Sequence, residues 1–165
     1  MHHFFFDASA FVKRYHQEPG SKIVNYVVDS LLASGPERAI ISSLILSETI
    51  SVLSRERNAD RIPAELFQQA SARLLFEART MSQQPIDDET ILESISLINR
   101  HNLNASDALF LRQALNLRAL LKNLEHDLVV VASDLRLLRA TGVEGLSELN
   151  PEEASLKDAE ALLQI

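Results

Sequence analysis

Short apolar runs alternate along the chain with longer stretches whose apolar positions recur at helical spacing. The clearest run, Leu128–Ala132, is continuous and mostly β-branched, which indicates a strand buried on both faces. Pro85 would be poorly tolerated in a central strand, so the weak run before it favours an edge position. The predicted strands cover residues 4–6, 39–41, 80–85, 128–132 and 145–149.

Helices are predicted between these strands, because apolar side chains recur there three and four residues apart. The predicted helices cover residues 8–15, 22–32, 44–58, 63–78, 88–100, 105–121 and 135–141, with a further helix at the C-terminal end. Asp87, Asn104 and either Ser42 or Ser43 are suitable caps for three of them. The Asn-Pro-Glu-Glu sequence at 150–153 predicts the start of the C-terminal helix, since Asn is a favourable cap and Pro suits the first helical position.

This alternation predicts βαβ units with right-handed crossovers, and therefore a parallel sheet covered by helices on both faces. We expect an α/β, three-layer fold with a central, mostly parallel sheet of about four to five short strands. No long linker or internal repeat divides the 165 residues, and this length suits one domain. A single domain spanning residues 1–165 is expected.

The amino-acid composition excludes several kinds of functional site. The absence of cysteine excludes disulfides, thiolate zinc sites and cysteine nucleophiles. Neither a signal-peptide pattern nor an apolar stretch of about 20 residues is found, so we expect a cytoplasmic protein that does not enter a membrane. The net charge of −7 argues against a broad basic surface for nucleic acid. It remains compatible with a nuclease whose carboxylates bind a cation through which phosphates then bind.

Three aspartates lie where strands give way to helices. Asp7 directly follows the apolar run 4–6, Asp134 follows the run 128–132, and Asp107 lies in the first turn of a predicted helix. The carboxyl ends of parallel strands share one edge of the sheet, and ligands of open α/β sheets bind there. Each aspartate is also explained by helix capping or by the helix dipole, so each one alone leaves both interpretations open.

Glu48 is predicted to lie inside a helix, among apolar neighbours such as Ile45 and Val52. A carboxylate on a core-facing stripe is costly unless it is paired or bound to a metal. The alternative is a helix rotated so that Glu48 reaches solvent beside Ser47 and Ser51. Taken with the three aspartates, Glu48 predicts a site for one or two hard divalent cations, with the four carboxylates within a few ångströms of one point.

Other groups of residues give weaker evidence for a functional site than the four carboxylates do. The five histidines show no ligand spacing and are expected on the surface or in loops, and no glycine-rich phosphate loop is found. Ser9, Ser106 and Ser133 lie beside the carboxylates and are interpreted either as supporting hydrogen-bond donors or as ordinary turn and cap residues. Asp7-Ala8-Ser9 also leaves open an aspartate-nucleophile phosphatase of the haloacid-dehalogenase type. Ser9 stands where those enzymes usually have a second aspartate.

Four ordered segments resemble the motifs of the PIN-domain family, and specifically its VapC-like ribonuclease toxins. They are Phe6–Tyr15 with the turn Glu18–Ser21, then Leu46–Thr49, Asn104–Leu109 and Val131–Leu138. The match spans nearly the whole chain, and its motifs follow in the family's order.

The resemblance implies a PIN-like fold, Mg²⁺- or Mn²⁺-dependent RNA cleavage, frequently a homodimer and, for a toxin, a cognate antitoxin. It makes Asp7, Glu48, Asp107 and Asp134 the catalytic, metal-binding residues, with Asp7 and Asp107 as the direct ligands. Ser9, Ser106 and Ser133 would support them. For phosphate contacts we predict the basic residues Lys13, Arg14 and Arg136, whose alternative is a solvated surface.

A different class of function remains open beside these enzymes. The chain could be a catalytically idle PIN-like module that acts through dimerisation or protein binding. The four acidic residues argue against it, because an idle site has no reason to keep the desolvation cost of neighbouring carboxylates.

Overall fold

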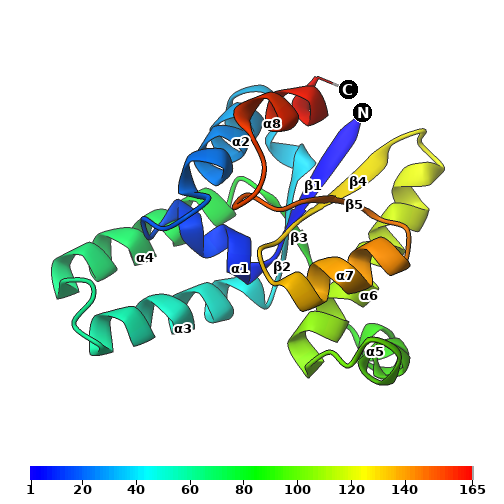
Figure 1. Ribbon diagram of the computed structural model, residues 1–165, viewed down its shortest axis with the longest axis horizontal. Coiled ribbons are helices and arrows are strands. Elements are labelled where there is room, and N and C mark those ends of the chain that lie inside the picture. Colours follow the sequence, from blue (N-terminus) through cyan, green and yellow to red (C-terminus); the bar gives the residue numbers. More distant parts are fainter. Residues whose placement is uncertain (165) are drawn as a thin grey trace.

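The computed structural model describes residues 1–164 and has helices on both faces of one central sheet (Figure 1). The five strands found in these residues are all parallel, in the order β3-β2-β1-β4-β5. They are β1 (His2–Phe6), β2 (Ala39–Ser42), β3 (Ser82–Gln84), β4 (Asp127–Val131) and β5 (Ser147–Leu149). The predicted three-layer α/β fold is confirmed, and β3 lies at an edge, as the position of Pro85 favoured.

The helices fill the intervals between the strands and extend beyond the last strand. They are α1 (Ala8–Phe11), α2 (Ser21–Ser34), α3 (Ile45–Asn58), α4 (Ala64–Ala78), α5 (Asp88–His101), α6 (Ala105–Lys122), α7 (Leu135–Val143) and α8 (Leu156–Leu163). Two short 3₁₀ helices, η1 (Val12–Arg14) and η2 (Pro36–Arg38), complete the described elements.

The central strand β1 is apolar on both faces because both faces are covered. Phe4 and Phe6 belong to a core shared with α1, α2 and α8, whereas Phe5 points to the opposite face. There the Phe5 ring stacks on Phe110 of α6, with 4.3 Å between the ring centroids. This explains why β1 reads as a continuous apolar run rather than an alternating one.

The strand order changes direction beside β1. The chain moves outward from β1 to β2 and β3, then returns across the sheet to place β4 on the other side of β1. Phe6 is in register with Val131, and the Asp7 amide donates to the Val131 carbonyl at 2.9 Å. The carboxyl ends of β1 and β4 therefore meet at the reversal point, where open α/β folds form their ligand sites.

Helices α3 and α4 lie side by side and extend away from the sheet (Figure 1). Leu53 of α3 forms a small apolar cluster with Val12 and Ile62, and Phe67 and Ala70 of α4 pack against it. A buried ionic pair ties α4 to the first motif, because the Arg14 guanidinium donates to both Glu77 carboxylate oxygens, at 3.1 and 2.9 Å. Apolar packing of Leu53 thus holds α3, which carries Glu48, in place. The neighbouring helix α4 is held by the pair between Arg14 and Glu77.

Several sequence-based boundaries were wrong. The helix predicted over 8–15 is a short α1 followed by η1, and α3 begins at Ile45 with no side-chain cap from Ser42 or Ser43. The 150–153 segment forms a turn in which the Glu152 amide donates to Asn150 Oδ1 at 3.1 Å. The C-terminal helix α8 begins only after Ser155, whose hydroxyl and Asp158 form a capping box. A second capping signal therefore prevailed over the Asn-Pro one.

The expectation that all five histidines lie on the surface or in loops was also wrong. His3 is in β1 and shares a 3.0 Å hydrogen bond with His126. His101 ends α5, and its largely buried side chain lies 2.7 Å from Glu144. These histidines join elements of the scaffold rather than lining the acidic pocket described below.

Candidate active site: an acidic pocket at the end of β1

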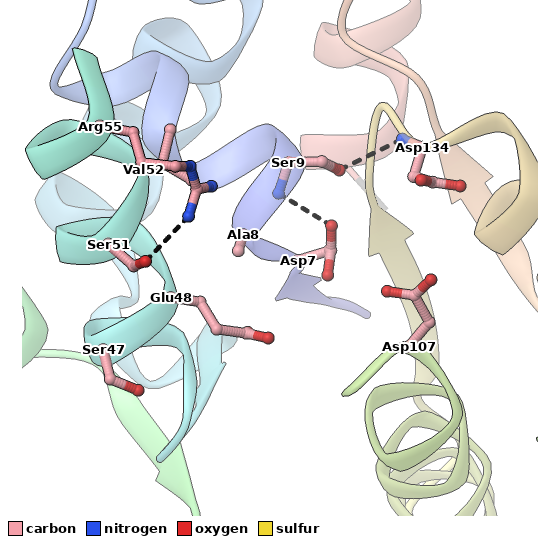
Figure 2. A pocket seen from close by; sticks show the side chains of 10 residues that line it. All are labelled: Asp7, Ala8, Ser9, Ser47, Glu48, Ser51, Val52, Arg55, Asp107 and Asp134. Atoms are coloured by element: carbon pink, nitrogen blue, oxygen red, sulfur yellow. Dashed lines mark hydrogen bonds between the residues drawn. The ribbon is translucent and has the colours of Figure 1, made fainter. Parts of the chain in front are cut away.

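A pocket of about 490 Å³ opens at the carboxyl edge of the sheet (Figure 2). It is lined by Asp7, Ala8, Ser9, Ser47, Glu48, Ser51, Val52, Arg55, Asp107 and Asp134. All four carboxylates predicted from the sequence thus reach one pocket, although they come from four separate segments of the chain.

Asp7 lies at the floor of the pocket, where β1 ends and α1 begins. It caps α1, because the Ser9 amide donates to Asp7 Oδ2 at 2.8 Å. Its side chain is buried, and burial raises the pKa of the Asp7 carboxyl although hydrogen bonds from Ser9 lower it. The Asp7 side chain therefore both caps α1 and lines the pocket.

Asp134 caps α7 in the same manner, since its Oδ1 accepts from the amides of Arg136 and Leu137 at 2.8 and 3.0 Å. Ser9 fixes the loop before it, because the Ser9 hydroxyl accepts from the amides of Ser133 and Asp134 at 2.9 and 3.2 Å. The motif after β1 and the motif after β4 are thus held together by a serine side chain (Figure 2). This gives Ser9 a definite structural reason to be a small hydroxyl residue.

Asp107 lies in the first turn of α6 and faces the pocket with only 13% of its side chain exposed. Its Oδ2 is buried and has no hydrogen-bond partner among residues 1–164. Burial first, and then the charges of Asp7 and Asp134, raise the pKa of Asp107 to about 6. A carboxylate in this position would be stabilised by a cation in the pocket.

Glu48 comes from α3 on the other wall of the pocket and is half-buried. Burial, followed by the charges of Asp7 and Asp107, raises its pKa, while the nearby Ser106 hydroxyl lowers it. The prediction that Glu48 lies in the interior of its helix was wrong. Because α3 begins at Ile45, Glu48 lies in its first turn, where the helix dipole favours a negative charge. Its position in the pocket, not the lack of a local explanation, now supports its role.

The remaining predicted serines differ in their contacts. Ser106 donates to Asn104 Oδ1 at 3.1 Å, within the cap of α6. Ser133 has a buried hydroxyl without a hydrogen-bond partner in the described chain. Ser133 is therefore the one of the three serines whose side chain the described fold leaves unbonded.

The donor chemistry of the pocket suits a hard divalent cation. Four carboxylates line it, and one buried oxygen of Asp107 has no hydrogen-bond partner among residues 1–164. Burial raises the pKa values of Asp7, Glu48 and Asp107. Among residues 1–164, however, no three acidic or histidine side chains lie close enough together to hold a metal as they stand. The four carboxylates line one pocket, but their expected convergence within a few ångströms of one point is not found among residues 1–164. Since like charges repel, the side chains would have to turn inward around a cation.

Two of the three basic residues predicted to contact phosphate are placed elsewhere. Lys13 is buried and its Nζ lies 2.7 Å from Glu152 Oε1, and Arg14 is buried against Glu77. Cations that are buried and paired are not exposed to a substrate, so the structure does not support this role for Lys13 or Arg14. Glu152 is 139 positions from Lys13 and Glu77 is 63 positions from Arg14, separations that no local sequence pattern reveals. Glu18 and Asp29 form further ion pairs with Lys13 and Arg14, at 3.7 and 2.6 Å.

Arg136 is placed at the rim of the site. Its Nη2 lies 3.9 Å from Asp107 Oδ2, and 48% of its side chain is exposed. A pocket-lining cation that was not predicted, Arg55, extends from α3. The spacing of seven residues from Glu48 would have placed it on the same helical face.

The comparison that decides the family is with the PIN-domain family model, which matches residues 4–143. The chain belongs to the PIN-domain family. The matched span includes β1 and β4 together with all four pocket carboxylates. PIN domains are generally nucleases, so the acidic pocket is the candidate active site. This assignment also removes the support for a haloacid-dehalogenase-type phosphatase.

Solved structures share the fold at low identity. PAE2754 from Pyrobaculum aerophilum is 19% identical, with both chains covered over 100% of their length and a TM-score of 0.63. A toxin-antitoxin complex from Klebsiella pneumoniae is 17% identical, covering 91% of this chain and 98% of that one, with a TM-score of 0.57. The structure of FitAB bound to the IR36 DNA fragment is 12% identical, covering 92% and 97%, with a TM-score of 0.64. No curated protein sequence matches the chain significantly.

At these identities the solved structures establish the fold alone. One further observation concerns membranes: none of the helices in the described part of this PIN domain is both long and apolar enough to cross one.

Proposed function

We propose that this PIN domain is a divalent-metal-dependent endoribonuclease that hydrolyses phosphodiester bonds of RNA in the cytoplasm. One observation carries the proposal: carboxylates from four separate segments line one pocket at the strand-order reversal of a PIN fold. Helix caps alone would account for Asp7 and Asp134, but they do not account for Asp107 and Glu48 facing the same pocket.

The electrostatics of the pocket support a cation there. RNA is a polyanion, and four carboxylates would repel its phosphates unless their charge were offset. Burial raises the pKa values of Asp7, Glu48 and Asp107, and the charges of neighbouring carboxylates raise them further. A bound Mg²⁺ or Mn²⁺ would remove the repulsion and give the phosphate a partner.

Roles within the pocket follow from burial and hydrogen bonding. Asp7 and Asp107 are proposed as the direct ligands of Mg²⁺ or Mn²⁺, while Glu48 and Asp134 complete the site or hold a water molecule. When bound, the metal supplies polarisation of the phosphodiester and activation of the attacking water. Ser9 orients the loop that carries Asp134, and Ser106 and Ser133 are proposed to support the carboxylates next to them. Arg136, at the rim, is proposed to contact a phosphate.

Cleavage of total RNA tests the proposal. We expect the wild-type protein to degrade RNA with Mg²⁺ or Mn²⁺ and to lose this activity with EDTA. Asp7→Asn and Asp107→Asn should each lower the cleavage rate about 100-fold or more, since each removes a proposed ligand but keeps its shape. A matched control is Asp88→Asn, in the exposed first turn of α5. An inactive wild type, or activity that survives both pocket substitutions, would refute the proposal.

We further propose that the nuclease is the toxin of a type II toxin-antitoxin pair. Support comes from the toxin-antitoxin complex of Klebsiella pneumoniae, whose chain is covered over 98% of its length. The antitoxin would block the pocket with a basic side chain among the carboxylates, where the surplus negative charge attracts it. Co-expression with the product of the adjacent gene should yield a stable, inactive complex. Recovery of the nuclease alone and fully active would argue against a cognate antitoxin.

A homodimer is the oligomeric state we propose. The supporting observation is a group of exposed apolar side chains on α5, namely Ile91, Leu92 and Ile95. Contiguous exposed apolar groups of this kind often mark protein interfaces.

A further inference from the structure

The acidic pocket has two chemically different ends. One end contains Asp7, Asp107 and Asp134, and the α3 end contains Glu48 together with Ser51, Val52 and Arg55 (Figure 2). Glu48, Ser51 and Arg55 lie on one face of this helix, because they are spaced by three and four residues. Arg55 therefore stands about 10 Å along the helix from Glu48, on the same wall of the pocket.

Arg55 differs in its contacts from the buried cations of the first motif. It is exposed, and its Nη1 donates to the Ser51 hydroxyl at 2.9 Å (Figure 2). Within residues 1–164 it has no carboxylate oxygen within 4.0 Å, whereas Lys13 and Arg14 are both engaged in ion pairs. Ser51 therefore holds the guanidinium at the pocket with one of its five N–H donors, and the others remain for a ligand.

The chemistry of that ligand follows from the guanidinium and its surroundings. A planar guanidinium with several donors matches the oxygens of a phosphate. The substrate of the proposed nuclease carries a phosphate at every nucleotide, so a strand lying in the pocket presents further phosphates outside the carboxylate cluster. Arg136 lies beside Asp107, at the end of the pocket that contains the three aspartates and thus on the far side from Arg55. A strand that contacts both arginines crosses the carboxylates between them.

We propose that Arg55, oriented by Ser51, binds a phosphate of single-stranded RNA next to the phosphate that is hydrolysed. This inference rests on the proposed ribonuclease function and adds a substrate path across the pocket from α3 to α7. Arg55 is a binding residue in this account, and Ser51 is a positioning residue.

Binding and cleavage of a labelled single-stranded RNA oligonucleotide test the inference together. Arg55→Gln should raise both the dissociation constant and KM about 5-fold, which is the size expected for an exposed charge contact, and should leave kcat within about 2-fold. Arg55→Lys should restore part of the affinity. The slope of log affinity against log salt should become shallower by about 0.7, because one phosphate contact is lost. Ser51→Ala should cause a smaller loss of the same kind.

Lys122→Gln provides the matched control, because it removes the same charge at the opposite end of α6 from Asp107. It should change neither affinity nor salt slope. Substituting single phosphates of the oligonucleotide by neutral methylphosphonates then locates the contact. One position should weaken binding to the wild type but have little further effect on Arg55→Gln.

The outcomes separate this inference from the function on which it rests. Equal dissociation constants and equal salt slopes for Arg55→Gln and Lys122→Gln would overturn the role of Arg55, whether or not RNA is cleaved. RNA binding that depends on Arg55 without any cleavage by the wild type would overturn the proposed function and leave the contact standing. An identical methylphosphonate profile for the wild type and Arg55→Gln would also contradict the contact.

Discussion

Asp107 combines burial, an unbonded carboxylate oxygen and two neighbouring negative charges in one side chain. These features make it costly in the metal-free protein and useful once a cation is bound. Functional sites commonly carry a stability cost of this kind. The same reasoning applies more weakly to Glu48, whose position in the first turn of α3 gives it partial compensation.

Asp107→Asn is expected to stabilise the metal-free protein by about 1–2 kcal/mol, because it removes a buried negative charge near two others. This corresponds to a rise in Tm of about 2–8 °C for a chain of this size. Thermal unfolding in EDTA measures it. Asp88→Asn, at an exposed position in the first turn of α5, serves as the control and should change Tm far less. A lower Tm for Asp107→Asn would show that the native carboxylate is stabilising and would contradict the account of the pocket.

The stability difference between Asp107→Asn and the wild type should depend on pH, because the pKa of Asp107 is raised in the folded state. The pKa of Asp107 is raised from 3.8 to about 6, so the folded state binds its proton more tightly than the unfolded state. The destabilising effect of the charged form is absent below about pH 4, develops between about pH 4 and 6, and is complete above that. The stability difference between Asp107→Asn and wild type in EDTA should therefore grow across this window and then level off. A difference that is constant from pH 4 to 7 would count against the shift.

At the scale of elements, the local signals predicted most of the fold. Continuous apolar runs located β1 and β4, and the Asp87 and Asn104 caps located the starts of α5 and α6. The start of the C-terminal helix was missed because a second local signal, the Ser155 capping box, prevailed over the Asn-Pro one. Non-local contacts also fix parts of the fold. One example is the turn 150–153, against which Gly20 packs at a positive φ of 89° that L side chains rarely adopt.

The candidate site shows the same division between local and non-local information. Its four carboxylates could be predicted because each carries a local signal, namely the end of an apolar run, a helix start or an apolar helical face. The pairs of Lys13 with Glu152 and of Arg14 with Glu77 could not be predicted, since these partners are distant in the sequence. Arg55 was missed because its importance depends on the orientation of the α3 face that carries Glu48.

The pair between Arg14 and Glu77 anchors α4, and its removal is predicted to be destabilising. Glu77 accepts from Arg14, Tyr15 and Arg73, and hydrogen bonds from these partners hold its pKa below the usual value although burial opposes them. Glu77→Gln should lower the free energy of unfolding by about 1–3 kcal/mol, because it removes the buried carboxylate of the pair. Arg14 then keeps Asp29, whose side chain is 65% exposed, as a charged partner at 2.6 Å. Urea unfolding at pH 7 measures this change in free energy.

Glu65→Gln, on the exposed first turn of the same helix, is the control and should cost well under about 1 kcal/mol. Because the pKa of Glu77 is depressed, its contribution is present above about pH 4.5 and is lost as the pH falls through the folded-state pKa. The difference between wild type and Glu77→Gln should therefore shrink in acid. Equal stabilities at pH 7 would show that the pair contributes nothing net.

At the scale of the whole molecule, the sheet order brings the ends of β1 and β4 together, and α3 and α6 add the other two carboxylates. The net charge of −7 is then understandable, because the proposed substrate is bound through a cation and a few arginines rather than through a basic surface. The pocket opens on one edge of the sheet, which leaves the helical layers available for contacts with partners.

The proposed homodimer is tested at α5. Leu92 is 69% exposed between Ile91 and Ile95 on the helix, and a charge placed there would disfavour burial in an interface. Leu92→Glu should shift the mass measured by sedimentation from dimer towards monomer, while Leu66→Glu on α4 should not. A wild-type mass equal to that of a monomer at high concentration would contradict the dimer, and a dimer unaffected by Leu92→Glu would place its interface elsewhere.

The acidic pocket is proposed to bind a divalent cation and to use it to cleave RNA. The most direct measurement follows Mn²⁺-dependent thermal stabilisation and cleavage of one labelled RNA oligonucleotide in the wild type, Asp107→Asn and Asp88→Asn. We expect Mn²⁺ to raise the Tm of the wild type and of Asp88→Asn and to enable both to cleave, whereas Asp107→Asn should lose both responses. RNA cleavage by the wild type in EDTA, or full stabilisation and cleavage by Asp107→Asn with Mn²⁺, would contradict the proposal.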